Sequence, residues 1–250
     1  MTALGHGAFV LSGDCIAVWS LRTDVSEATA AKFEPFLSVD EKERAARCRF
    51  EGLRVAFSVT RGALRYLLGR YLKLHPELIR FKYGPKGKPA LALDIGIEFN
   101  TTHSGDLAAF AFAADCEVGI DLEKIRPLPE VEDIANRFFS KDEAIELASL
   151  APEERLAAFY RCWTGKEAYL KAVGCGLSAP LDEFRVSLTA DETTPLIQFG
   201  YDRDAVKPWT LHDLSVGPDY AGALAYRDRP RFISLFPTID PIELFDLAGH

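Results

Sequence analysis

Apolar residues recur every three or four positions in two long stretches of the chain. The first stretch, Leu53–Leu74, predicts an amphipathic helix of several turns. The second, Glu153–Val173, predicts another long helix that ends at Gly174, a residue typical of helix termination. Among the polar positions of the first helix are four arginines: Arg54, Arg61, Arg65 and Arg70.

Shorter helices are predicted over Ala28–Leu37 and after two capping boxes. In each box a serine is followed three residues later by a glutamate, as in Ser38 with Glu41 and Ser140 with Glu143. The serine and glutamate side chains of such a box satisfy amide groups that have no partner in the first turn of a helix. Both boxes therefore predict helix starts.

Most of the remaining apolar runs are short and are predicted to form strands. They are Asp14–Leu21, Ile79–Tyr83, Ile95–Asn100, Leu107–Ala113, Glu117–Glu123, Phe184–Leu188, Leu196–Gly200, Trp209–Leu214, Ala221–Tyr226 and Phe232–Phe236. Each half of the chain thus runs strand, helices, strands, without the strict alternation of a doubly wound parallel sheet. We predict an α+β fold of two halves, 1–115 and 116–250, although the halves show no close sequence repeat.

The composition indicates a globular protein without a membrane span. The chain has 250 residues, of which 48% are hydrophobic and 26% charged, and it contains no run of about twenty apolar residues. Its first residues lack the pattern of a secretory signal. Five scattered cysteines form no C-x-x-C pair, so we expect free thiols in a reducing cytoplasm.

Charge is distributed unevenly along the chain. Between Lys42 and Lys88 there are thirteen lysines and arginines against three glutamates, a net charge of +10, and since the whole chain carries −8 the remainder carries −18. A basic segment in an acidic protein favours a compact polyphosphate ligand over nucleic acid. A solvated basic helix face is the alternative interpretation.

The carboxylates Asp121 and Glu123 stand two positions apart in a predicted strand, so both side chains point to one face. Two oxygen ligands at this spacing suit Mg²⁺, which completes its shell with water and phosphate. On this pattern alone an exposed strand edge is equally compatible.

Glu167 and Lys171 stand four positions apart on the second long helix and therefore share a face. They are compatible with a third carboxylate beside a phosphate-binding lysine. A surface ion pair of roughly 0.3 to 0.5 kcal/mol is the alternative.

Two polar segments complete the candidate chemistry. A turn is predicted between the strands on either side of Thr102 and His103, whose side chains can donate to phosphate, although a lone histidine is often structural. The loop Lys86-Gly87-Lys88-Pro89 brings two ammonium groups together but is not a P-loop. The sequence also lacks G-x-S-x-G, H-E-x-x-H and G-x-G-x-x-G, which excludes the commonest hydrolase, metalloprotease and dinucleotide-binding motifs.

The order of these motifs resembles that of the 4′-phosphopantetheinyl transferases, and the length and doubled layout resemble their broad-specificity Sfp-type group. The resemblance covers Ser38 to Ser178 and rests on Gly87-Lys88-Pro89, Phe99–Ser104, Gly119–Glu123, Trp163–Lys171 and Gly174–Ser178. It implies a pseudo-duplicated fold with the active site between the two halves. It also implies a monomer that acts on coenzyme A and an apo acyl or peptidyl carrier protein, with no nucleic-acid or membrane partner.

The resemblance assigns roles to individual residues. Asp121, Glu123 and Glu167 would hold Mg²⁺ against the coenzyme A pyrophosphate, with Glu167 also the expected general base. Lys171, Thr102 and His103 would contact phosphate. The residues expected along the nucleotide and its 3′-phosphate are Lys42, Arg44, Arg47, Lys86, Gly87, Lys88 and Pro89. Two alternatives stay open: a non-catalytic protein that binds coenzyme A or a carrier protein, and a Mg²⁺-dependent nucleotide pyrophosphohydrolase.

Overall fold

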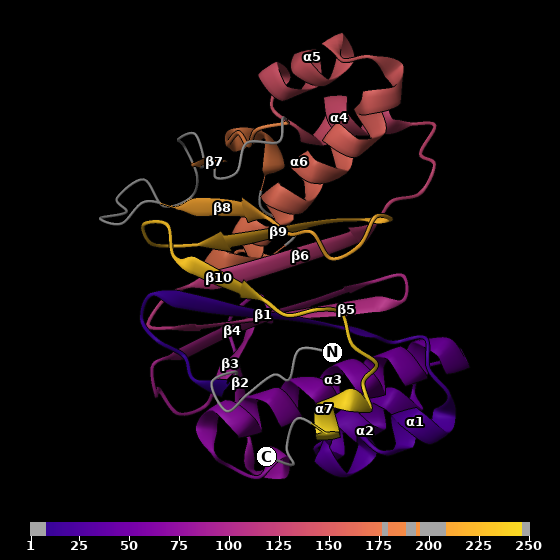
Figure 1. Ribbon diagram of the computed structural model, residues 1–250. Helices are drawn as coiled ribbons and strands as arrows, with labels where there is room; N and C mark the ends of the chain where they lie inside the picture. The colour runs from indigo at the N-terminus through magenta and orange to yellow at the C-terminus, as the bar shows by residue number, and fades with distance from the viewer. Residues whose placement is uncertain (1–8, 177–179, 189–193, 196–208, 247–250) are drawn as a thin grey trace.

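Two β-sheets lie face to face between two layers of helices in the computed structural model of this chain (Figure 1). The structure describes residues 9–176, 180–188, 194–195 and 209–246. Apolar side chains of β1 and β5 meet those of β6 and β9 in a core between the sheets. One further core lies between each sheet and the helices that pack on it. Among the described residues, no helix combines the length and the apolar character needed to cross a bilayer.

The first layer contains most of the residues before 115. Its sheet has the order β10-β1-β5-β4, with bounds Phe232–Leu235, Cys15–Arg22, Leu107–Ala114 and Ile97–Ser104. The long helix α3, Glu51–Leu72, covers the outer face of this sheet with α1, Glu27–Ala31, and α2, Val39–Ala46, beside it (Figure 1). A small hairpin of β2, Phe81–Tyr83, and β3, Pro89–Leu91, follows α3.

The second layer repeats this arrangement. Its sheet has the order β6-β9-β8-β7, with bounds Val118–Lys124, Tyr220–Tyr226, Thr210–Asp213 and Thr194–Pro195. The helices α4, Val131–Phe138, α5, Lys141–Ser149, and α6, Pro152–Val173, follow β6, and α6 packs on the sheet. The strands β1, β4 and β5 and the strands β6, β8 and β9 are paired in the same way. In each set the first strand along the chain pairs with the third, and the third pairs with the second, so β1-β5-β4 and β6-β9-β8 share one order.

The α+β class predicted from the sequence is confirmed. The division at residues 115 and 116 stays a prediction, and the end of the chain does not follow it. There β10 pairs in parallel with β1, and α7, Glu243–Asp246, contributes Leu244 and Phe245 to the first core.

Several predicted elements differ from the observed ones. The helix predicted over Ala28–Leu37 is split into α1 and a 3-10 turn that contains Pro35, because proline cannot continue the hydrogen-bond ladder. The polar turn predicted around Thr102 is wrong, since β4 runs to Ser104 and pairs with β5 throughout. Helix α4 was not predicted, and the strand predicted over Leu196–Gly200 lies outside the described residues.

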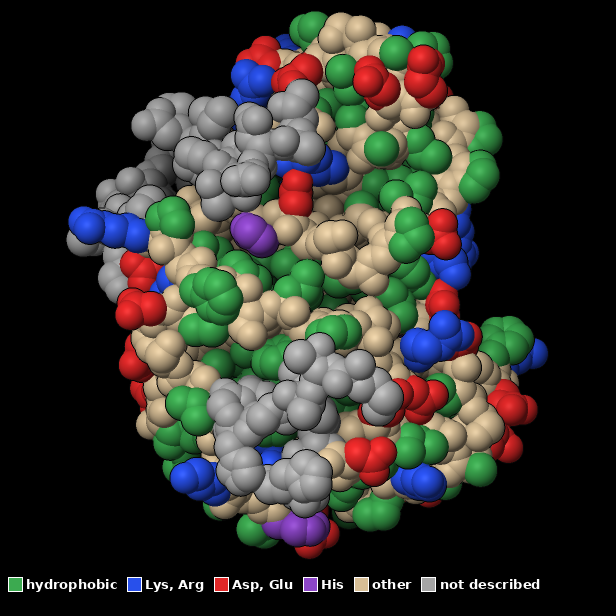
Figure 2. All heavy atoms as spheres, in the orientation of Figure 1, with side chains coloured by type: hydrophobic (Ala, Val, Ile, Leu, Met, Phe, Trp, Pro, Cys, Tyr) green, Lys and Arg blue, Asp and Glu red, His purple; other side chains and the backbone are tan. Residues whose placement is uncertain are grey.

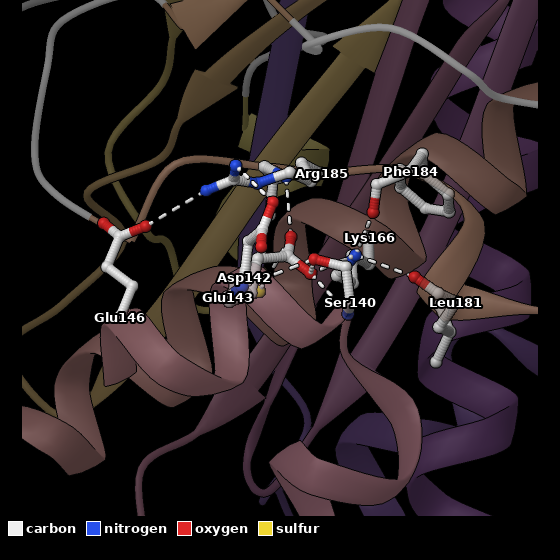
Figure 3. A network of polar contacts seen from close by, with 10 residues as sticks. Ser140, Asp142, Glu143, Glu146, Lys166, Leu181, Phe184 and Arg185 are labelled. Atoms are coloured by element: carbon white, nitrogen blue, oxygen red, sulfur yellow. Dashed lines mark hydrogen bonds and ion pairs between the residues drawn. The ribbon is translucent and has the colours of Figure 1, made fainter. Parts of the chain in front are cut away.

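No named strand covers Phe184–Leu188, where the sequence predicts one, although Arg185 lies in a single β-bridge. Among the described residues, side chains of α5 and α6 bind the backbone of this segment (Figure 3). Lys166 Nζ of α6 donates to the carbonyls of Leu181 at 2.7 Å and Phe184 at 2.5 Å. Glu143 Oε1 of α5 accepts from the Val186 amide at 2.8 Å. Lys166 and Glu143 pair at 2.9 Å with fully buried side chains, so one buried ion pair joins α5, α6 and this segment.

The two layers also meet along a pair of edge strands, β4 and β6. Asn100 Oδ1 accepts from the Ile120 amide at 3.0 Å, and Ser104 Oγ accepts from the Lys124 amide at 3.1 Å. Side chains of β4 thus satisfy backbone groups that an edge strand would otherwise leave unpaired. This seam brings the polar face of β4 onto the carboxylate strand β6.

Candidate active site

The site depends on an unusually close approach of strand β6 to helix α6. Gly119 lies against the helix backbone, where an added Cβ would overlap the Ala168 carbonyl oxygen and the Ala172 amide nitrogen. Only glycine permits this contact, and alanines on the helix face keep it free of larger side chains. The close packing brings the carboxylates of β6 beside those of α6.

Asp121 is buried, with 3% of its surface exposed. Its Oδ1 accepts from Lys171 Nζ at 2.6 Å and from Thr102 Oγ1 at 3.1 Å. Its Oδ2 is buried and has no hydrogen-bond partner among the described residues. Burial raises the pKa of Asp121, and the nearby Lys171 charge opposes that shift.

Glu123 and Glu167 complete a cluster of three carboxylates. Glu123 Oε2 accepts from Ser104 Oγ at 2.7 Å, and burial raises the pKa of Glu123, to which the Asp121 charge adds. Burial raises the pKa of Glu167 to about 7, with further contributions from the negative charges of Asp121 and Glu123. The three groups therefore act on one another electrostatically, since each negative charge disfavours ionisation of its neighbours.

Lys171 supplies the positive charge of the cluster in this structure. Its Nζ bonds both Asp121 and Thr102, the latter at 3.0 Å. Thr102 therefore faces the carboxylate cluster, and its phosphate-binding role stays a prediction. His103 follows it on the strand, so its side chain points to the opposite side of β4, where it is exposed. Surrounding protein still removes part of the water around the exposed ring, and this desolvation, followed by the Lys171 charge, lowers the pKa of His103.

The donor set suits a hard divalent cation. All three carboxylates offer oxygen, the ligand type that Mg²⁺ prefers, and the buried Oδ2 of Asp121 is left unsatisfied. Within the described ranges, however, no three acidic, histidine or cysteine side chains already stand in metal-binding positions. The salt bridge between Lys171 Nζ and Asp121 Oδ1 holds one of these oxygens instead.

The loop Lys86–Pro89 lies against the carboxyl end of α6. Lys88 Nζ donates to the carbonyls of Ala172 at 2.7 Å and Val118 at 3.2 Å. This places the loop beside the start of β6 and the end of α6, and it commits the Lys88 ammonium to backbone groups. That the loop lies along the nucleotide stays a prediction. The adjoining Gly174 and Gly176 both have positive φ, while Leu177 and Ser178 of the same motif lie outside the described residues.

The basic side chains between Lys42 and Lys88 include buried ion-pair partners and exposed cations. Glu41 accepts from Arg61 and Arg65, each at 2.5 Å, and the second of these arginines is buried, contrary to its predicted place on a polar face. Lys42, Arg44 and Arg47, by contrast, are exposed on α2 and at its end.

These three exposed side chains belong to the first helical layer, whereas the carboxylates lie at the seam between the sheets (Figure 1). The outline of the molecule is indented on one side at the level of this seam, with charged side chains of both signs at its borders (Figure 2). A ligand that reached from α2 to the carboxylates would therefore cross from one layer to the other.

Sequence reasoning missed Asn100 and Ser104 as parts of the site. Both stand on the same face of β4 as Thr102, and Ser104 bonds directly to Glu123. Three short polar side chains at every second position are the signal that identifies this face. The mistaken turn assignment hid that signal, because turns impose no alternation.

Comparisons with known proteins identify the family of this chain. The family model of the 4′-phosphopantetheinyl transferase superfamily matches residues 117–225, which span β6 to β9. The 4′-phosphopantetheinyl transferase HetI of Nostoc sp. is 37% identical over 218 residues, 86% of this chain and 89% of the relative. The 4′-phosphopantetheinyl transferase Sfp of Bacillus subtilis is 32% identical over 215 residues, 84% of this chain and 92% of the relative.

The chain belongs to the 4′-phosphopantetheinyl transferase superfamily. The similarity to Sfp over nearly its whole length confirms the Sfp-type group expected from the sequence. The predicted function, transfer of the 4′-phosphopantetheine arm of coenzyme A to a serine of an apo carrier protein, is confirmed at the level of this family, and nothing in the comparisons favours a non-catalytic binding protein.

Proposed function

We propose that this chain transfers 4′-phosphopantetheine from coenzyme A to an acyl or peptidyl carrier protein in a Mg²⁺-dependent reaction at the carboxylate cluster. The observation that carries the proposal is the buried, unpartnered Oδ2 of Asp121 beside two further carboxylates. An unpaired buried carboxylate oxygen is costly unless a cation or donor completes it. Asp121, Glu123 and Glu167 would hold the metal.

Two groups of side chains are proposed to bind coenzyme A. Lys171 and Thr102, which already share Asp121 Oδ1, would turn their donors to the pyrophosphate, with His103 at its margin. The backbone of the loop Lys86–Pro89 would line the nucleotide. Lys42, Arg44 and Arg47 would meet the 3′-phosphate, since their exposed cationic heads suit a phosphate in contact with water.

The reaction forms one bond and breaks another at the same phosphorus. The carrier serine Oγ loses its proton and attacks the β-phosphorus of coenzyme A, and adenosine 3′,5′-bisphosphate departs with the electrons of the broken P–O bond. When bound, Mg²⁺ would neutralise charge on the pyrophosphate, the main electrostatic demand of phosphoryl transfer.

Within this reaction the chain's own residues hold the proton and the phosphates. Glu167 would accept the serine proton as the general base. Burial and its acidic neighbours raise the pKa of Glu167 to about 7 without the metal, and bound Mg²⁺ would lower that pKa. Lys171 carries a positive charge to the same point from the next turn of α6. In this proposal Glu167 is therefore both a metal ligand and the general base.

Intact mass spectrometry of an apo carrier protein tests the reaction. The carrier is incubated with this protein, coenzyme A and Mg²⁺, with an EDTA-treated sample as control. A gain of one phosphopantetheine that disappears with EDTA is expected. No gain on fatty-acid, polyketide and peptide carriers, or cleavage of coenzyme A without a carrier, would contradict the proposal.

The monomeric state, the cytoplasmic location and the absence of nucleic-acid or membrane partners stay predictions from the sequence. Size-exclusion chromatography with light scattering measures the first of these. A single molecular mass near 27.7 kDa is expected, since both layers needed for the seam come from one chain. A dimer in which the seam is exchanged between copies would contradict it.

A further inference from the structure

Lys88 makes contacts that its predicted role as a nucleotide-binding lysine does not require. Its Nζ donates to the Ala172 carbonyl in the last turn of α6 and to the Val118 carbonyl at the start of β6. The last carbonyls of a helix have no partner within the helix, and a cation there also interacts favourably with the helix dipole. One ammonium group therefore joins the loop of the first layer to two elements of the second.

The end of α6 is shaped to receive the loop. Gly174 and Gly176 have φ of +78° and +71°, which few other residues adopt readily. A Cβ on Gly174 would lie 3.4 Å from Lys88 Cδ, and one on Gly176 would lie 3.1 Å from Lys86 Cβ. The two glycines thus let the aliphatic parts of both lysines lie close against the backbone.

We infer that Lys88 is a positioning residue whose side chain fastens the loop Lys86–Pro89 to the carboxyl end of α6 and does not bind a coenzyme A phosphate. The significance of this loop rests on the proposed function, in which its backbone lines the nucleotide. Ala172, the carbonyl partner, directly follows Lys171. The fastening therefore holds the nucleotide loop and the phosphate-binding lysine in one fixed arrangement before coenzyme A arrives.

The experiment compares Lys88→Met with the wild-type protein, and Lys82→Met is the matched control. Lys82 is an exposed lysine of the neighbouring strand β2, so its replacement removes the same charge but leaves the two Lys88 hydrogen bonds in place. The first measurement is amide hydrogen exchange without ligand. Lys88→Met is expected to speed exchange about tenfold in residues 84–91 and 170–176, as loss of partly buried charged hydrogen bonds predicts. Unchanged exchange would overturn the inference.

The second measurement is the salt dependence of coenzyme A binding and turnover. In Lys88→Met the KM for coenzyme A is expected to rise about tenfold with kcat changed less than about twofold, because the loop must then be ordered on binding. The salt dependence of binding should match that of the control. A weaker salt dependence than the control would show that the Lys88 ammonium meets a phosphate, and would overturn the inference.

The two measurements separate this inference from the proposed function. Absence of transfer by the wild-type protein would contradict the proposed function, while the exchange experiment would still decide whether Lys88 fastens the loop. Normal transfer with unchanged exchange in Lys88→Met would contradict only the inference.

Discussion

At the scale of single residues, the site is a place where negative charge is concentrated and water is largely excluded. Asp121 and Glu167 are 3% and 6% exposed, and the pKa of each is raised mainly by burial. The fold thus keeps carboxylates where their ionised forms are disfavoured. Such a cost is common at functional sites, where a ligand supplies the missing interaction.

The raised pKa of Glu167 predicts how stability depends on pH in the metal-free protein. Between its ordinary value of 4.5 and about 7, the folded chain retains a proton that the unfolded chain has released. The resulting stabilisation is complete below pH 4.5 and is lost as pH rises to about 7, a fall of up to about 3 kcal/mol in the free energy of unfolding. Urea unfolding in EDTA at several pH values measures it.

The variant Glu167→Gln lacks this titration and should show a flatter pH profile. The pH dependence of the free energy of unfolding that remains should come from Asp121 and Glu123, whose pKa values are also raised. Identical profiles for the variant and the wild-type protein would contradict the assigned pKa.

Gly119 predicts a steric limit on the site. Gly119→Ala places a methyl group against the backbone of α6, so β6 and the helix must separate. We expect a loss of about 1 to 3 kcal/mol in the free energy of unfolding, as for other overpacked sites, and a large loss of transfer activity. Gly52→Ala is the control, because nothing lies within 4 Å of its added Cβ. Equal stability of the two variants would show that the close approach is unnecessary.

At the scale of elements, α6 carries two polar networks on different faces. Glu167 and Lys171 face the carboxylate cluster, whereas Lys166 pairs with Glu143 on the other side (Figure 3). The second network fixes the helix against α5 and the segment that follows it. We expect the Lys166–Glu143 network to set the orientation in which α6 presents Glu167 and Lys171 to the carboxylate cluster.

This network predicts a strong coupling between its two charges. Lys166→Met leaves the Glu143 carboxylate buried without its cation, which should cost about 3 to 5 kcal/mol. Adding Glu143→Gln to that variant should recover part of the loss, because no buried charge remains. A double-mutant cycle by urea unfolding measures the coupling. Additive effects of the two substitutions would contradict it.

The same elements show what the sequence could and could not predict. Helices α3 and α6 and strand β6 were predicted because periodicity and caps are local signals. Phe184–Leu188 has the composition of a strand, but the Phe184 carbonyl and the Val186 amide bind side chains of α6 and α5, which local composition does not reveal. For the same reason Arg65 was placed on a polar face, although Glu41 binds it in the interior.

At the scale of the whole molecule, the site exists because two similarly ordered layers meet along β4 and β6. Neither layer holds all of its groups: Thr102 and Ser104 come from the first, and the three carboxylates and Lys171 come from the second. The sequence predicted two halves and named the carboxylates. The resemblance implied an active site between the halves, but the sequence did not predict that β4 and β6 form the seam, because contacts between distant strands depend on tertiary structure.

The measurement that tests the account most directly is a Mn²⁺ titration followed by electron paramagnetic resonance in the presence of coenzyme A. Mn²⁺ accepts the same oxygen ligands as Mg²⁺ and reports binding without any turnover. We predict one bound ion in the wild-type protein, binding at least about tenfold weaker in Asp121→Asn, and unchanged binding in Glu153→Gln, an exposed control on α6. Equal binding by the wild-type protein and Asp121→Asn would contradict the metal site, and with it the central claim.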